Sequence, residues 1–277
     1  RQMCIRDRTK PFAAHDLGTY PLANGQVYGG DMPVEESGNM LILTAAIAAV
    51  EGNADYAAKH WEVLTTWTDY LVEKGLDPEN QLCTDDFAGH FAHNTNLSIK
   101  AILGVASYGR LAEMLGKKDV AESYTTKARQ MAAEWERMAN DGDHYRLTFD
   151  KPGTWSQKYN LVWDKLLGLN IFDTKIAEME IPYYLTKQNI YGLPLDSRET
   201  YTKTDWIMWT ATMAPDLATF REFIVPLHKF MNETIDRVPM SDWVFTDKPN
   251  WRGFKARSVV GGYYMKMLEG KLIGNKQ

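Results

Sequence analysis

Acidic side chains recur in three polar segments that each precede an apolar, helix-like stretch of the sequence. They are Asp16, the pair Glu35 and Glu36, and the pair Asp85 and Asp86. Hydrolysis of an amide or a glycoside needs one group to activate water and another to protonate the leaving group. Two carboxyl groups in one cavity can do both if their surroundings separate their pKa values. We therefore predict that these five residues are catalytic candidates, and that Asp16 lines one cavity with Glu35 or Glu36 and with Asp85 or Asp86.

Each of these acids also has an ordinary structural interpretation, which stays open at this point. Glu35 and Glu36 fall in the first turn of a predicted helix, where negative charge complements the helix dipole. Asp85 and Asp86 suit capping or turn positions, and Asp16 suits an Asx-turn. Two adjacent acids such as Asp85 and Asp86 would nevertheless be costly to bury without a compensating role.

Other polar and aromatic side chains are candidates for binding a substrate. They are Tyr28, Asn94, Trp163, Arg198, Asp205 and Trp209. Aromatic rings line pockets for sugars, although they are more often core residues. Asp205 precedes Trp206 at a predicted helix start, so it could be a helix cap instead. Arg198 and Lys203 are loop cations that could bind an α-carboxylate.

The sequence lacks the motifs of several other hydrolase and nucleotide-binding classes. No Ser heads an S-x-x-K, and no G-x-S-x-G elbow, Walker A sequence or G-x-G-x-x-G is present. His90 and His93 have a helical spacing but no obvious third ligand, so we expect no metal site. We predict direct attack of water assisted by carboxyl groups, with no metal or organic cofactor.

The composition is that of an ordinary folded domain, with 44% hydrophobic and 24% charged residues among 277. A net charge of −5 argues against nucleic-acid partners. The longest apolar stretch, residues 40–50, is interrupted only by Thr44 and is shorter than the roughly 18 residues expected of a membrane span. Two cysteines, Cys4 and Cys83, exclude a four-cysteine metal site.

Helical periodicity dominates the elements that must position these side chains. Pro33 favours the start of one helix that continues to Val50, and Asn53 and Gly75 bound a second. Further helices are predicted at 97–115, 120–138, 159–168, 172–179, 204–213, 216–234 with a bend at Pro226, and 256–269 ending at Gly270. A short strand is predicted at 145–149, and irregular segments at 11–38 and 187–203. Roughly nine helices in antiparallel pairs predict an all-α array of hairpins in one domain.

Four long motifs resemble the glutaminase A family. They are HDLGTYPLANGQ with MPVEESGNML at 15–26 and 32–41, DDFAGHFAHNTNLSIKAI at 85–102, TWSQKYNLVWDKLLGLN at 154–170 and YGLPLDSRETYTKTDWIMWTA at 191–211. The resemblance extends over residues 10–273. It implies the C-terminal six-hairpin helical domain of that family, an (α/α)6 toroid.

The same resemblance implies a reaction, a location and partners. The reaction is hydrolysis of L-glutamine to L-glutamate and ammonia, and the location is extracytoplasmic, either periplasmic or secreted. The implied partners are β-rich N-terminal regions of the same protein and a small-molecule substrate, either glutamine or a sugar. A family label indicates fold more securely than reaction. A glycoside hydrolase and a non-catalytic helical module therefore remain alternatives.

Residues 1–9 match neither the periodicity nor the family resemblance. We interpret them as a spurious end of a metagenomic-type sequence, and residues 10–277 as the toroid domain. A closed toroid of six hairpins needs more helices than we count, so we expect a fragment that is incomplete at the N-terminus and lacks a signal peptide. The segments 40–50 and 256–269 should then expose an apolar patch, and the chain should self-associate or bind a hydrophobic dye.

Overall fold

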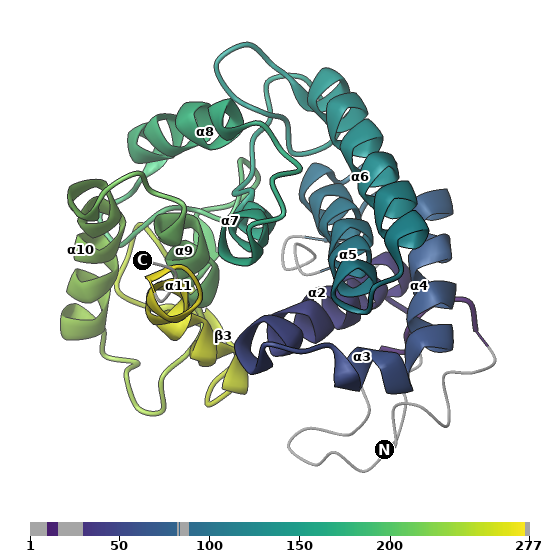
Figure 1. Cartoon of the computed structure of the whole chain (residues 1–277). Helices are drawn as coiled ribbons and strands as arrows, with labels where there is room; N and C mark the ends of the chain where they lie inside the picture. The colour runs from purple at the N-terminus through teal and green to yellow at the C-terminus, as the bar shows by residue number, and fades with distance from the viewer. Residues whose placement is uncertain (1–9, 16–29, 82, 84–88, 275–277) are drawn as a thin grey trace. The chain divides into compact units, whose positions relative to one another are not determined.

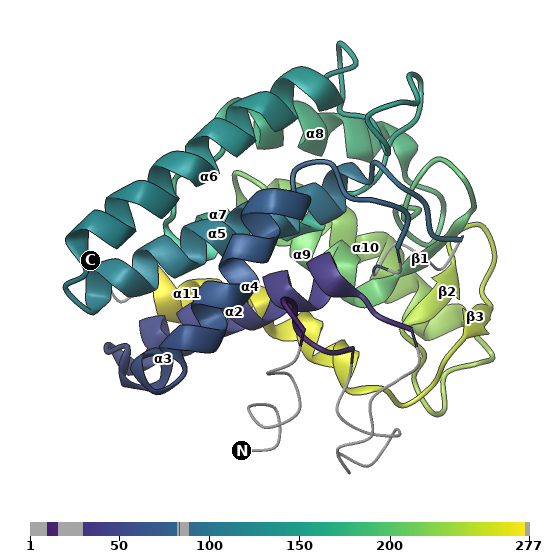
Figure 2. The ribbon, with the colours of Figure 1, turned by 90° about the vertical axis from the view of Figure 1, so that its right-hand side faces the viewer.

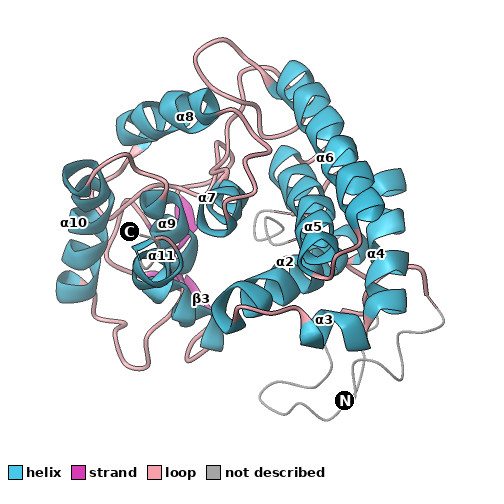
Figure 3. Ribbon diagram, in the orientation of Figure 1, coloured by secondary structure: helices cyan, strands magenta, loops and turns pink. Residues whose placement is uncertain are grey.

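The structure is a computed structural model that describes residues 10–15, 30–81, 83 and 89–274. They belong to two compact units, which we treat separately. Unit 1 comprises Arg1–Met138 and Leu167–Phe172, and unit 2 comprises Ala139–Leu166 and Asp173–Gln277. Most of the described residues are helical (Figure 3), which confirms the predicted all-α class. The assignment of residues 10–277 to one domain stays a prediction.

Unit 1 is built from helices whose bounds follow the sequence signals. They are α2 (Pro33–Glu51), α3 (Asp55–Lys59), α4 (Trp61–Lys74), α5 (Thr95–Met114) and α6 (Lys118–Ala139). Pro33 occupies the first position of α2, and Gly52 ends that helix with a φ of 71°. Asn94 caps α5 by accepting a hydrogen bond from the Leu97 backbone N–H. The predicted second helix is divided at His60, where the backbone leaves the helical region.

The packing of α2 against α5 is the most extensive helix contact of unit 1 (Figures 1 and 2). Two glycines allow this close approach. A Cβ atom at Gly38 would lie 2.7 Å from Cγ of Lys100, and one at Gly104 would lie 3.2 Å from Cα of Gly38. The first fifteen residues of α5, from 95 to 109, are all buried. Helix α5 is therefore the central helix of this unit.

Helices α4 and α6 add aromatic contacts to α5. The Tyr108 ring on α5 stacks on Trp61 of α4 at 4.5 Å and meets the Tyr124 ring of α6 edge-on at 4.8 Å. Trp135 is fully buried, and its indole N–H donates to the Thr95 carbonyl oxygen at 2.8 Å. Helices α5 and α6 confirm the helices that the sequence predicts at 97–115 and 120–138.

Unit 2 combines shorter helices with a small sheet. Its helices are η3 (Tyr159–Leu161), α7 (Val162–Leu167), α8 (Thr174–Lys187), α9 (Thr204–Thr212), α10 (Leu217–Glu233), η4 (Ser258–Tyr264) and α11 (Met265–Leu272). Strands β1 (Tyr201–Lys203), β2 (Trp243–Phe245) and β3 (Trp251–Gly253) form an antiparallel sheet in that order (Figure 2). Strand β1 runs directly into α9. The sequence analysis missed the sheet because each strand spans three residues, too few to show an alternating pattern.

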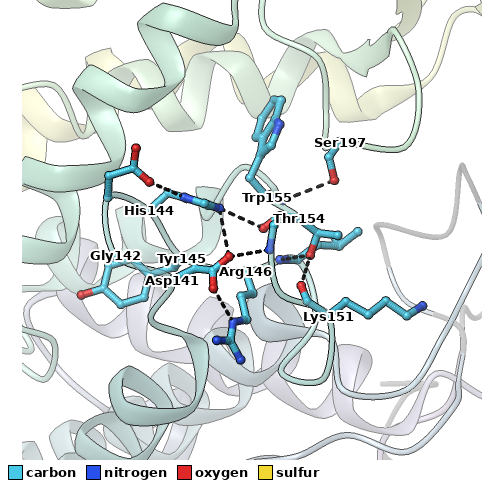
Figure 4. A network of polar contacts seen from close by, with 12 residues as sticks. Asp141, Gly142, His144, Tyr145, Arg146, Lys151, Thr154, Trp155 and Ser197 are labelled. Atoms are coloured by element: carbon cyan, nitrogen blue, oxygen red, sulfur yellow. Dashed lines mark hydrogen bonds and ion pairs between the residues drawn. The ribbon is translucent and has the colours of Figure 1, made fainter.

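The strand predicted at 145–149 is wrong. Tyr145 forms only an isolated bridge with Asn140, and side chains hold the rest of this loop (Figure 4). The Asp141 carboxylate accepts from Arg146 Nε at 3.0 Å and from the Gly153 N–H at 2.6 Å. These side-chain bonds replace the backbone ladder that a strand would need.

Two predicted helices also differ from the structure. Helix α8 starts after Asp173, which caps it, and continues through Pro182 to Lys187 instead of covering 172–179. The helix predicted at 256–269 is divided into η4 and α11, and α11 continues through Gly270. Helix α10 agrees with the prediction and contains Pro226.

Some helices expose apolar side chains. On α2 of unit 1, Leu43 is 52% and Val50 is 44% exposed, and on α11 of unit 2 Met267 is 69% exposed. The expectation that further helices cover such residues stays a prediction. None of the described helices combines the length and the hydropathy that a membrane crossing requires.

The substitution Gly38→Ala should destabilise unit 1, because its methyl group would overlap the Lys100 side chain and crowd the α5 backbone. We expect the free energy of unfolding to fall by about 1–3 kcal/mol, as for other overpacked sites. Gly270→Ala is the matched control, because a Cβ there meets no atom within 4 Å. It should stabilise α11 by up to about 1 kcal/mol. Urea unfolding of both variants checks this, and equal effects would contradict it.

Candidate active site

The predicted catalytic residues divide into two groups in the structure. Asp16, Asp85 and Asp86, together with the predicted substrate-binding Tyr28, lie outside the described residues. A cavity lined by Asp16, by one of Glu35 and Glu36, and by one of Asp85 and Asp86 therefore stays a prediction. The pair Glu35 and Glu36 is described, and both residues lie in the first turn of α2.

Glu35 points into the α2–α5 interface and is 1% exposed. Its partner is Lys100 of α5, whose side chain is 5% exposed and whose Nζ donates to Glu35 Oε1. A charged carboxylate without a partner would be strongly unfavourable at this depth. The ion pair therefore explains how Glu35 can be buried at all.

Glu36 is half-buried and next to Glu35 on the same helix. Asn39, one turn further along α2, has its Nδ2 at 3.4 Å from Glu35 Oε1 and at 3.3 Å from Glu36 Oε2. The side-chain amide of Asn39 thus bridges the two carboxyl groups. Two acids and an amide share one helix face, with a lysine reaching in from the neighbouring helix.

Burial raises the pKa of Glu36 to about 7, and the negative charge of Glu35 contributes to the rise. The Asn39 hydrogen bond and the positive charges of Lys100 and His15 act in the opposite direction. Glu36 can therefore gain and lose a proton near neutral pH, whereas Glu35 is held in an ion pair. A carboxyl group that exchanges its proton near neutral pH can act as a general acid or base.

His15, Asn39 and Lys100 are site residues that the sequence analysis missed. His15 Nδ1 lies 2.6 Å from the Gly30 carbonyl oxygen, which selects the tautomer with the proton on Nδ1 when the ring is neutral. Lys100 stands within the apolar stripe of α5. A lysine in such a position is almost never buried without a partner, and that was the available signal.

Unit 2 has a second cluster of buried charge at the junction of β1 and α9. Lys203 Nζ lies 2.7 Å from Asp242 Oδ2 and 3.3 Å from Asp205 Oδ1. Burial and the nearby Asp242 raise the pKa of Asp205 to about 6, while Lys203 opposes the rise. Asp242 is buried too, but its hydrogen bonds with Arg257 and the charge of Lys203 hold its pKa below the usual range.

Aromatic rings surround this cluster. Tyr159 stacks on Trp206 with centroids 4.5 Å apart, and Lys203 Nζ lies 4.4 Å from the Trp206 centroid. Trp209 meets Trp163 edge-on at 5.5 Å. A Cβ at Gly262 of η4 would lie within 3 Å of both Trp209 Nε1 and Asp205 Cβ. The structure thus brings together three predicted substrate-binding residues: Asp205, Trp163 and Trp209.

The other two described candidates have contacts of a structural kind. The guanidinium group of Arg198 donates two hydrogen bonds to the Asp196 carboxylate, from Nε to Oδ1 at 2.9 Å and from Nη2 to Oδ2 at 2.6 Å. Asn94 is fully buried; its oxygen caps α5, and its nitrogen lies 3.4 Å from Cys83 Sγ. Substrate binding by these two residues stays a prediction.

A groove of about 570 Å³ in unit 1 lies between α5, α6 and the turn at 168–171, and none of the predicted site residues lines it. The described side chains contain no group of three or more His, Cys, Asp or Glu placed to hold a metal ion.

Comparison with known proteins supplies a family match. A family model described as the glutaminase A six helical-hairpin domain matches residues 7–267. Glutaminase A of Aspergillus oryzae is 37% identical over 268 residues, which cover 93% of this chain and 39% of that protein. A protein of Arthroderma benhamiae named "Probable glutaminase" is 29% identical over 360 residues, covering 96% of this chain and 41% of its own length. The chain spans about two-fifths of these relatives.

The raised pKa of Glu36 predicts how stability depends on pH. The folded state holds the Glu36 proton more tightly than the unfolded state, whose carboxyl has a pKa near 4.5. The stabilisation that the Glu36 proton gives to the folded state is present at low pH and is lost as the pH rises through about 7. In Glu36→Gln, unfolding free energy should therefore decline less between about pH 5 and about pH 8, by about 1–3 kcal/mol. Urea unfolding at several pH values measures this, with Glu62→Gln on the exposed face of α4 as control. An unchanged slope in Glu36→Gln would contradict it.

Proposed function

We propose that this chain, which belongs to the glutaminase A six helical-hairpin domain family, takes part in the hydrolysis of L-glutamine to L-glutamate and ammonia. The observation that carries the proposal is the Glu35–Glu36 pair, in which one carboxylate is locked in a buried ion pair and the other has a pKa of about 7. The activity belongs to the full-length protein, because the relatives named as glutaminases are longer than this chain.

In the proposed reaction Glu36 is the general acid. The bond between the side-chain carbonyl carbon and the amide nitrogen breaks, and a new bond forms between that carbon and the oxygen of water. Protonated Glu36 donates to the departing nitrogen, which leaves as ammonia, while a second carboxylate accepts a proton from the attacking water. Return of that proton to Glu36 restores the site.

The second carboxylate is not Glu35 in this proposal, because Glu35 is 1% exposed and paired with Lys100. The predicted catalytic residues Asp16, Asp85 and Asp86 are the candidates for the base. We also propose an extracytoplasmic location and β-rich N-terminal partner regions, both of which rest on the family resemblance alone.

Glycoside hydrolysis is the second candidate function, and one observation in unit 2 favours it. Asp205 combines a pKa of about 6 with a position beside the rings of Trp206 and Trp209. An acid with a raised pKa next to aromatic rings is the arrangement that suits protonation of a glycosidic oxygen. In this alternative Asp205 is the acid and the aromatic cluster binds the sugar.

The substitution Glu36→Gln should abolish most of the glutaminase activity of the full-length protein, because glutamine cannot donate a carboxyl proton. We expect kcat to fall about 100- to 10,000-fold, the range for loss of a general acid. Ammonia release from L-glutamine measures it. Glu51→Gln, at the exposed end of the same helix, is the control and should keep wild-type activity. A Glu36→Gln variant that is folded and as active as wild type would refute the role of Glu36.

The two candidate functions separate in a substrate comparison on the full-length protein. We expect ammonia from L-glutamine and no reducing sugar from a panel of glycans. Reducing-sugar release that survives Glu36→Gln and is lost in Asp205→Asn would establish the alternative instead.

A further inference from the structure

The side chain of Lys100 has room to reach Glu35 because residue 38 of α2 is a glycine. Gly38 lies one turn after Glu35 on α2, and its missing Cβ leaves room for the Lys100 stem, because a Cβ there would be 2.7 Å from Lys100 Cγ. The lysine therefore passes over Gly38 and places its Nζ on Glu35 Oε1. Its side chain is 5% exposed, so the ammonium group is held by protein and not by bulk water.

The ion pair between Lys100 and Glu35 joins two helices at a high cost in desolvation free energy. Removing two charges from water costs several kcal/mol per ion, and well-packed apolar side chains would often join the helices equally well. The pair lies next to Glu36, which shares the Asn39 amide with Glu35. A role in setting the protonation of Glu36 would account for its position.

Among the residues that the structure describes, the charged and polar groups near Glu36 come from α2, α5 and the segment before α2. Helix α2 contributes Glu35 and Asn39, helix α5 contributes Lys100, and the segment before α2 contributes His15. Glu35 favours a proton on Glu36, whereas Lys100 and His15 disfavour it. Burial is the largest cause of the raised pKa of Glu36, and the charge of Glu35 raises it further, by more than Lys100 lowers it.

We propose that Lys100 is the positioning residue that fixes Glu35 as the permanent anion of the pair and thereby leaves the exchangeable proton on Glu36. This inference rests on the proposed role of Glu36 as the acid and adds the residue that decides which carboxyl carries the proton. Without Lys100, two adjacent carboxyl groups would share one proton. Glu35 is the more buried of the two, so the shared proton would move towards it and Glu36 would lose the anionic neighbour that adds to its raised pKa.

The test compares Lys100→Met with Lys100→Arg, which keeps the charge. The first measurement is the titration midpoint of the Glu36 carboxyl by 13C NMR, with the signal assigned through Glu36→Gln. In Lys100→Met the midpoint should fall by about 1 pH unit or more, because Glu36 loses its anionic neighbour. The alkaline limb of the pH–kcat profile for glutamine should fall by the same amount. Lys100→Arg should keep both close to wild type.

A matched control separates this role from a structural one. Lys158 of unit 2 is fully buried and lies 4.0 Å from Glu180, so Lys158→Met also removes a buried lysine beside a carboxylate. It should lower the Tm and leave the Glu36 midpoint unchanged. If Lys100→Met behaves in the same way, Lys100 is structural and the inference is wrong.

Two further outcomes remain informative. If Lys100→Met does not fold, the double variant Glu35→Gln with Lys100→Met removes the charged pair without leaving a lone buried charge. The Glu36 midpoint should fall in this variant as well, and an unchanged midpoint would overturn the inference. If the midpoint moves as expected but Glu36→Gln hydrolyses glutamine normally, Lys100 has the inferred role and the proposed function is wrong.

Discussion

The close approach of α2 and α5 is the constraint on which the rest of unit 1 depends. It exists because Gly38 and Gly104 carry no side chain, so the two helix backbones can meet where larger residues would hold them apart. Helix α5 is then buried along most of its length, and each polar group on it needs a partner. The partner of Lys100 is Glu35, and that pairing determines the charge felt by Glu36.

The two units use the same electrostatic arrangement with different elements. In unit 1 a buried lysine from α5 pairs with one acid of α2 and leaves the neighbouring acid with a raised pKa. In unit 2 Lys203 pairs with Asp242 and leaves Asp205, in the first turn of α9, with a raised pKa. In both cases a buried lysine pairs with one acid, while burial raises the pKa of the other.

The sequence predicted the two long helices α5 and α6 well, because both have apolar residues at steps of three and four. Gly116 also marks the end of α5 clearly. The sequence analysis missed β1, β2 and β3, whose three residues each contain too little pattern, and it missed the break at His60. Glu35 and Glu36 stood out by residue type. Lys100 did not, because pairing between helices is a tertiary contact that periodicity along one helix cannot reveal.

The aliphatic part of the Lys100 side chain, which lies over Gly38, also restricts sliding of α2 along α5. A side chain held in the gap left by a glycine fixes the register of two helices, because sliding α2 along α5 would drive the stem into the next turn. The carboxyl groups of α2 are then fixed in space before any substrate arrives. A group held in this way needs little reorganisation as charge develops in a transition state. For the role that we propose for Glu36, this rigidity would mean that the acid is preorganised and that the reacting bond is brought to it.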